Sequence, residues 1–172
     1  RPNTDVALML GIAHTMIVED LHDRNFLERC CIGFDQFQSY VLGAGGVQRD
    51  ADWAAGICDI DPESIRWLAR RIANRRTLIS VAWSLQRADH GEQPYWMGVT
   101  LAAMSGSLGR LGGGFGAGYG AEHAVGHWRD RPSVAGFRRP SNPVGDYIPV
   151  ARVTDMLLSP GTTFDYNGQQ LI

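Results

Sequence analysis

The chain of 172 residues contains no lysine, and all 16 of its basic residues are arginine. A Walker A loop needs a lysine that binds phosphate, and protein kinases need a lysine on a strand. Pyridoxal phosphate enzymes and Schiff-base aldolases need a lysine amine as their nucleophile. The sequence therefore excludes these chemistries within the chain, although GC-rich codon usage by itself would also give a chain without lysine.

Cysteine is scarce, with three residues at positions 30, 31 and 58. Cys30 and Cys31 are adjacent and Cys58 is far from both, so the chain has neither a CxxC pair nor the spacing of a zinc site. The odd number also argues against a disulfide framework. We expect buried free thiols.

Two common hydrolase signatures are missing. His123 and His127 are four residues apart, but Glu122 precedes the first of them, unlike the glutamate of HExxH. Ser84 lacks a GxSxG setting. We expect neither a zinc centre nor a serine nucleophile.

Long apolar runs and an excess of charge are also absent. No run approaches the roughly 18 residues that a membrane span needs, and a formal net charge of −2 does not suggest a nucleic-acid binder. With 44% hydrophobic residues, the composition is that of a globular protein, and the length allows one domain or parts of two. Because the chain opens at Arg1 without methionine, we expect a segment of a longer protein.

The pattern of apolar residues and helix caps predicts an α/β protein that is rich in helix and has few parallel strands. Helices are expected over 5–17, 23–29, 34–42, 50–57, 62–76, 94–108 and 149–158, a buried strand over 77–83, and a hairpin over 164–172 around Asn167-Gly168. A polar loop is expected over 84–91 and a long irregular excursion over about 110–147. A change in composition near 74–76 suggests two α/β domains, with residues 1–75 at the end of one and 76–172 in part of the second.

The stretch from Trp83 to Pro94 is the best candidate for a site, because it joins the carboxyl end of a strand to the start of a helix. Ligands of open α/β sheets bind in that position, and the free N–H groups of a helix start attract anions. Gln86 can contact a heterocycle, Arg87 can bind a phosphate or carboxylate, and His90 can donate a hydrogen bond or move a proton. An ordinary polar loop is the alternative.

The sequence of this stretch, Trp83-Ser84-Leu85-Gln86-Arg87 followed by His90-Gly91-Glu92-Gln93-Pro94, resembles the dimethyl sulfoxide reductase family of molybdenum enzymes. Other motifs are similar to that family in the same order. They are Asn3-Thr4-Asp5 with the helix opening 7–15, the glycine segment 112–116, and the run 149–168. The resemblance is greatest to dimethyl sulfoxide, trimethylamine N-oxide and biotin sulfoxide reductases and is weakest over 122–143.

The resemblance implies a bacterial catalytic subunit several times longer than this chain. Such an enzyme holds one molybdenum between two molybdopterin guanine dinucleotides, reduces small S-oxides or N-oxides by oxygen-atom transfer, and receives electrons from a donor protein. The segment would bind cofactor and the rest of its own polypeptide, with no nucleic acid and no membrane span. The family's molybdenum ligand lies upstream, so the resemblance implies no metal ligand here.

By the same resemblance, some residues would contact the cofactor. Asn3, Thr4 and Asp5 match a site for the guanosine part of one dinucleotide, where a carboxylate suits the N–H groups of guanine. Trp83, Ser84, Gln86, Arg87 and His90 match the loop near a pterin and its phosphates.

Two rival interpretations stay open. A free-standing, non-catalytic binding domain derived from the family would fold alone and bind no molybdenum cofactor. Another branch, such as nitrate reductase or formate dehydrogenase, usually has an Asn-Gln-His type of loop, which the Trp83–Arg87 stretch does not match. The resemblance leaves the location open between periplasm and cytoplasm.

Overall fold

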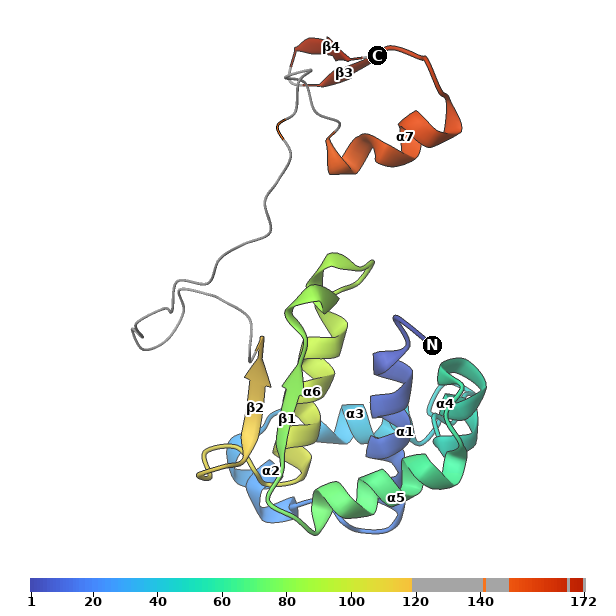
Figure 1. The fold of residues 1–172 in the computed structure, drawn as a ribbon. Helices are drawn as coiled ribbons and strands as arrows, with labels where there is room; N and C mark the ends of the chain where they lie inside the picture. The colour runs from blue at the N-terminus through green and yellow to red at the C-terminus, as the bar shows by residue number, and fades with distance from the viewer. Residues whose placement is uncertain (119–140, 142–148, 167, 172) are drawn as a thin grey trace. The chain divides into compact units, whose positions relative to one another are not determined.

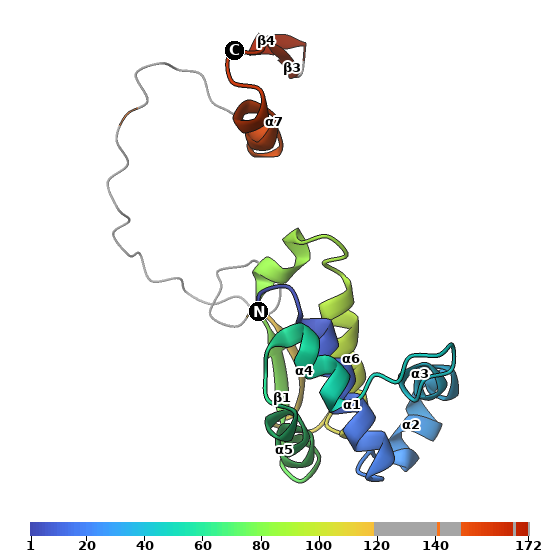
Figure 2. The ribbon, with the colours of Figure 1, turned by 90° about the vertical axis from the view of Figure 1, so that its right-hand side faces the viewer.

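The computed structural model describes residues 1–118, 141, 149–166 and 168–171. The chain divides into two units, Arg1–Val125 and Gly126–Ile172. The first unit carries the core and the predicted site residues (Figures 1 and 2). Its described part runs in the order α1 (Asp5–Val18), α2 (Arg24–Cys30), α3 (Phe34–Val41), α4 (Ala51–Cys58), α5 (Pro62–Ala73), β1 (Leu78–Val81), the 3-10 helix η1 (Trp83–Arg87), α6 (Gln93–Met104) and β2 (Gly114–Ala117).

Three of these helices begin where an aspartate caps the first turn. The side chains of Asp23, Asp50 and Asp61 accept hydrogen bonds from the backbone N–H of the third residue of α2, α4 and α5, at 2.8–2.9 Å. A carboxylate at this position satisfies an amide that has no partner within the helix and interacts well with the helix dipole. The caps explain why these helices start close to the predicted positions.

Helix α1 lies at the centre of the first unit. It packs against α4, α5 and α6 (Figure 1). Most of its residues between Ala7 and Ile17 are buried. The largest fully buried side chains of this core are Met16 of α1 itself and, from its neighbours, Ile65, Leu101 and Met104. A helix that is apolar on nearly all sides needs such neighbours. The core therefore fixes the start of α1 relative to the start of α6.

Strands β1 and β2 pair in parallel, with Leu78 opposite Gly114 and Val81 opposite Ala117. Helix α6 runs between the two strands in sequence and packs against both of them. The packing is close at Gly98, where an added Cβ would stand 2.8 Å from the ring of Phe115. This strand–helix–strand unit places the segment between β1 and α6 at the same end of the first unit as the amino terminus of α1 (Figures 1 and 2).

The second unit is small. Its described part holds the 3-10 turn η2 (Val150–Arg152), α7 (Val153–Leu158) and the antiparallel strands β3 (Phe164–Tyr166) and β4 (Gln169–Leu171). Phe164 pairs with Leu171 and Tyr166 with Gln169. The predicted hairpin is therefore confirmed, while Asn167 of its expected turn lies outside the described residues.

The α/β fold class is confirmed, but several expected elements were wrong in detail. The expected polar loop contains the 3-10 helix η1, and α6 ends at Met104 instead of continuing to 108. Part of the glycine-rich stretch expected to be irregular forms strand β2, because pairing with β1 satisfies its backbone. Of the expected buried thiols, Cys58 is buried, whereas Cys31 is half-buried and Cys30 is exposed at the end of α2.

A domain boundary at 75/76 in the full-length protein stays a prediction. Within the described residues, α6 contacts α1 as well as β1 and β2, so the helices before this position and the strands after it share one unit.

Candidate functional site

A cleft of about 390 Å³ lies between the amino terminus of α1 and the segment that joins η1 to α6. Asn3, Asp5 and Val6 line one side, and the other side is formed by Leu85, Ala88, Asp89, His90, Gly91, Gln93 and Pro94. Of the predicted site residues, the fold thus brings together Asn3 and Asp5 from the start of the chain and His90 from the Trp83–Pro94 stretch. It does so because α1 and α6 pack side by side in the core.

On the α1 side, Thr4 is the N-cap residue but does not cap the helix with its side chain. Its hydroxyl donates instead to the carbonyl oxygen of Arg1 at 2.7 Å. Asn3 precedes it with a left-handed φ of 60°, and the carboxylate of Asp5 stands in the first turn of the helix. The start of α1 therefore offers a carboxylate and an amide side chain to the cleft, while the Thr4 side chain holds the local turn.

On the other side, the chain from Ala82 to Gln93 is folded into consecutive tight turns. Backbone N–H groups of Leu85, Ala88, Gly91 and Gln93 each donate to a carbonyl three residues earlier, at 3.0–3.3 Å. Gly91 is buried against the loop, and a Cβ added there would stand 2.5 Å from the carbonyl oxygen of Gln86. The loop therefore has a closed shape that depends on the absence of a side chain at position 91.

The remaining predicted residues do not line the cleft. Trp83, Ser84, Gln86 and Arg87 belong to η1. Trp83 is 42% exposed and its ring lies beside Gly118, whose added Cβ would be 3.0 Å from Cε3 of Trp83. Arg87 is exposed and forms no ion pair with any residue in the described part of the chain. These four exposed side chains, one aromatic and three polar, lie on η1 next to the cleft.

The cleft is acidic at its edges. Asp5 and Asp89 both line it, and the exposed imidazole of His90 lies 3.9 Å from Asp89 and 4.0 Å from Glu92. A ligand with N–H donors is therefore a better match to its walls than a bare anion.

At the start of α6, the N–H of Gln93 donates to the carbonyl oxygen of His90 at 3.0 Å, and Pro94 has no N–H. Glu92 stands at the N-cap position, and the pKa of its carboxyl is lowered, mainly by a hydrogen bond from its own backbone N–H. A further bond from Gln93 and the charge of His90 act in the same direction. The Glu92 side chain forms no capping hydrogen bond to α6, and a phosphate site at this helix start stays a prediction.

Sequence reasoning did not identify Asp89 as a cleft residue or Tyr95 as a contact of this loop. Asp89 belongs to the stretch that drew attention, and its side chain is 97% exposed. The hydroxyl of Tyr95 lies 3.0 Å from the carbonyl oxygen of Ala82 and 2.9 Å from that of Trp83. The position of Tyr95 after a helix-opening proline does not indicate, from sequence, which group its hydroxyl contacts.

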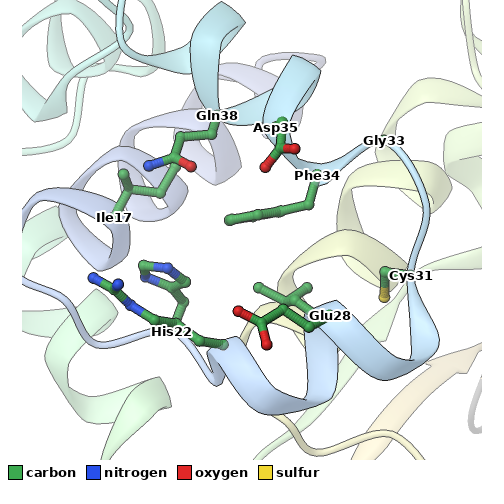
Figure 3. A pocket seen from close by; sticks show the side chains of 10 residues that line it. Ile17, His22, Glu28, Cys31, Gly33, Phe34, Asp35 and Gln38 are labelled. Atoms are coloured by element: carbon green, nitrogen blue, oxygen red, sulfur yellow. The ribbon is translucent and has the colours of Figure 1, made fainter.

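A second hollow, of about 440 Å³, lies among α1, α2 and α3 and contains none of the predicted residues. The ring of Phe34 stands in it, tilted toward His22 with ring centres 5.4 Å apart, and Glu28 and Asp35 contribute carboxylates from α2 and α3 (Figure 3).

Among the residues that the structure describes, no three His, Cys, Asp or Glu side chains gather in a way that could hold a metal ion. His123 and His127 lie outside those residues. The described helices include none that is long and apolar enough to cross a membrane.

Comparisons with known proteins agree with the resemblance read from the motifs. The family model for molybdopterin oxidoreductase matches residues 1–148. The chain is 47% identical to a dimethyl sulfoxide/trimethylamine N-oxide reductase of Cereibacter sphaeroides, and 44% identical to a biotin sulfoxide reductase of the same organism. It is 43% identical to the trimethylamine-N-oxide reductase of Pasteurella multocida.

These alignments cover 98–99% of this chain but only 22–23% of each relative. The chain thus spans about a quarter of the length of the relatives that it matches. With a family model that covers most of its residues and relatives at this level of identity, the chain belongs to the molybdopterin oxidoreductase family.

Proposed function

We propose that this chain forms part of the cofactor-binding region of a molybdenum enzyme that reduces S-oxides or N-oxides, and that its cofactor is a molybdopterin guanine dinucleotide. The family and the names of the relatives support the class of enzyme. The observation that carries the proposal is the cleft that joins Asn3 and Asp5 to the segment from Ala88 to Pro94.

The cleft fits a guanine nucleoside in its chemistry. A carboxylate such as that of Asp5 can accept both the N1–H and the N2–H of guanine, and the amide of Asn3 can donate as well as accept. A volume of about 390 Å³ lies within the range of small-molecule sites. Because the Thr4 hydroxyl is bonded to Arg1, Asn3 and Asp5 would make these contacts.

The surface of η1 suits the charged and ring-shaped parts of the same cofactor. Arg87 can form charge-assisted bonds to phosphate oxygens, and His90 can donate to an oxygen at the mouth of the cleft. Trp83 offers an aromatic face, and Ser84 and Gln86 offer polar groups for the edge of a heterocycle. When bound, the molybdenum cofactor supplies the two-electron chemistry that converts an S-oxide or N-oxide into the sulfide or amine.

The experiment is to purify the full-length protein and measure molybdenum by mass spectrometry and guanine nucleotide released by acid. Asp5→Asn is compared with Asp35→Asn, since both aspartates stand in the first turn of a helix but Asp35 lies away from the cleft. Loss of charge-assisted bonds worth roughly 1.5–3 kcal/mol should weaken cofactor retention by about ten- to a hundredfold in Asp5→Asn only. Equal contents of guanine nucleotide in both variants would contradict the assignment of the cleft.

The proposal also predicts oxygen-atom transfer from small S-oxides or N-oxides when an artificial electron donor is supplied. The alternative, a non-catalytic binding domain derived from the family, predicts a well-folded full-length protein without molybdenum. Finding such a protein after expression in a host that makes the cofactor would favour the alternative.

A further inference from the structure

Tyr95 connects the body of α6 to the end of strand β1. It stands in the first turn of the helix, and its hydroxyl lies 3.0 Å from the carbonyl oxygen of Ala82 and 2.9 Å from that of Trp83. Ala82 follows the strand and Trp83 opens η1. The single hydroxyl proton is therefore shared between two carbonyl groups at the corner where the strand turns into the loop.

The backbone turns of this loop are local. The turns that begin at Ala82, Leu85, Ala88 and His90 each link residues three apart, and the last of them reaches Gln93, the first residue of α6. The Tyr95 contacts span 12 and 13 residues and close the loop at its base. Fixing both ends of a loop reduces the number of conformations that its residues can adopt.

The position of the corner decides where Trp83 lies. Its backbone carbonyl is held by Tyr95, while its ring packs beside Gly118 at the end of β2. A corner free to move would carry Trp83 and the following residues of η1 away from the cleft, because η1 is a single short 3-10 segment.

We propose that Tyr95 is a positioning residue for the cofactor loop: its hydroxyl holds the Ala82–Trp83 corner and so orients η1 and the segment that lines the cleft. The proposal rests on the function proposed above. The hydroxyl carries this role, because the ring of a phenylalanine could keep the half-buried packing of Tyr95 without the hydrogen bonds.

The test compares Tyr95→Phe with Tyr40→Phe in the full-length protein. Tyr40 lies on α3, where its ring stands 3.5 Å from the Arg49 guanidinium and its backbone carbonyl accepts a hydrogen bond from Arg49. Hydrogen exchange of the amides in 82–92 is measured by mass spectrometry beside that in α1 and α5. Loss of the hydroxyl should speed exchange in 82–92 about three- to tenfold, the factor that corresponds to one ordinary hydrogen bond, and leave α1 and α5 unchanged.

The second readout is the rate at which molybdenum is lost when the purified protein is incubated in dilute urea. Tyr95→Phe should lose the metal several times faster than Tyr40→Phe. Unchanged exchange in 82–92, or an equal rise in α1 and α5, would overturn the role of Tyr95. Faster loop exchange with unaltered molybdenum loss would overturn it as well, because the position of the corner would then not matter to the cofactor. Absence of molybdenum from the unmodified protein would be a different result and would overturn the proposed function.

Discussion

The ring of Trp83 lies against the backbone of Gly118, so that a Cβ added to this glycine would stand 3.0 Å from Cε3 of the indole. The two residues follow the carboxyl ends of the paired strands β1 and β2. Gly118 also has a φ of 68°, in the left-handed region that favours glycine. The contact therefore joins the predicted cofactor loop to the glycine-rich stretch.

Replacing Gly118 with alanine should lower the stability and shift Trp83. The left-handed backbone costs about 1–2 kcal/mol for a residue with a Cβ, and the indole must also move by a few tenths of an ångström. Gly109→Ala is the matched control, because Gly109 has a φ of 78° and nothing within 4 Å of an added Cβ. Chemical unfolding of the full-length protein should show a larger loss for Gly118→Ala, together with a change in tryptophan fluorescence. Equal losses would mean that the contact with Trp83 contributes nothing.

Replacing Gly91 with alanine should cost far more stability than replacing a glycine at an open position in a helix. An added Cβ would lie 2.5 Å from the carbonyl oxygen of Gln86 and 2.7 Å from that of Leu85, and neither backbone group can rotate away. Gly91→Ala should therefore destabilise the protein by roughly 1–3 kcal/mol. It should also reduce the molybdenum content. The control is Gly56→Ala in α4, where nothing lies within 4 Å and alanine should stabilise the helix by about 0.5–1 kcal/mol. The idea fails if Gly91→Ala behaves like this control in thermal unfolding.

The elements that sequence reasoning predicted well are those specified by neighbours along the chain. The aspartate caps at Asp23, Asp50 and Asp61 place the starts of α2, α4 and α5, and apolar spacing gives α1 its length. Strand β2 was missed because Gly114 and Gly116 carry no side chains to make an alternating pattern, and its partner β1 is distant in sequence.

The same distinction applies to the candidate site. The Trp83–Pro94 stretch and Asn3-Thr4-Asp5 were found from local motifs, but no local pattern shows that Asp5 and His90 line one cleft. That proximity depends on the packing of α1 against α6. The Tyr95 hydroxyl contacts were likewise invisible, because they join a helix to a strand end across a loop.

Arg87 should matter for cofactor retention and little for folding. Its side chain is exposed in the last turn of η1, and the described residues give it no ion-pair partner. Arg87→Ala removes a donor worth roughly 1.5–3 kcal/mol to a phosphate, so molybdenum retention should fall about ten- to a hundredfold. Arg29→Ala is a matched control, since Arg29 is also exposed in the last turn of a helix. Compared without cofactor, both variants should unfold at the temperature of the unmodified protein. Full molybdenum content and turnover in Arg87→Ala would remove this residue from the site.

His14 should make the protein sensitive to mild acid. Its imidazole is buried in α1, and its Nε2 lies 2.7 Å from the amide nitrogen of Gln48. A neutral imidazole can accept a hydrogen bond from this amide, whereas a protonated one would set two donors against each other. The pKa of His14 is lowered, mainly by burial and further by Arg66, against the opposing charge of Asp50. An unfolded histidine titrates near 6.5, so below this pH the unfolded chain takes up more protons than the folded one. The stabilisation is complete above the pKa of the unfolded state and is lost as the pH falls toward the folded pKa.

The measurement is the free energy of unfolding between pH 8 and pH 5 for the unmodified protein and for two variants. His14→Gln should reduce the loss of stability on the acid side, because the titrating group is gone. Gln48→Glu places a carboxylate beside the imidazole, which favours its protonated form, raises the folded pKa toward that of the unfolded state and should make the acid-side loss of stability smaller. If the unmodified protein and His14→Gln lose stability in parallel over this range, another group causes the acid sensitivity. Any weakening of the packing around position 48 by Gln48→Glu would lower stability equally at every pH, whereas the titration of His14 changes its dependence on pH.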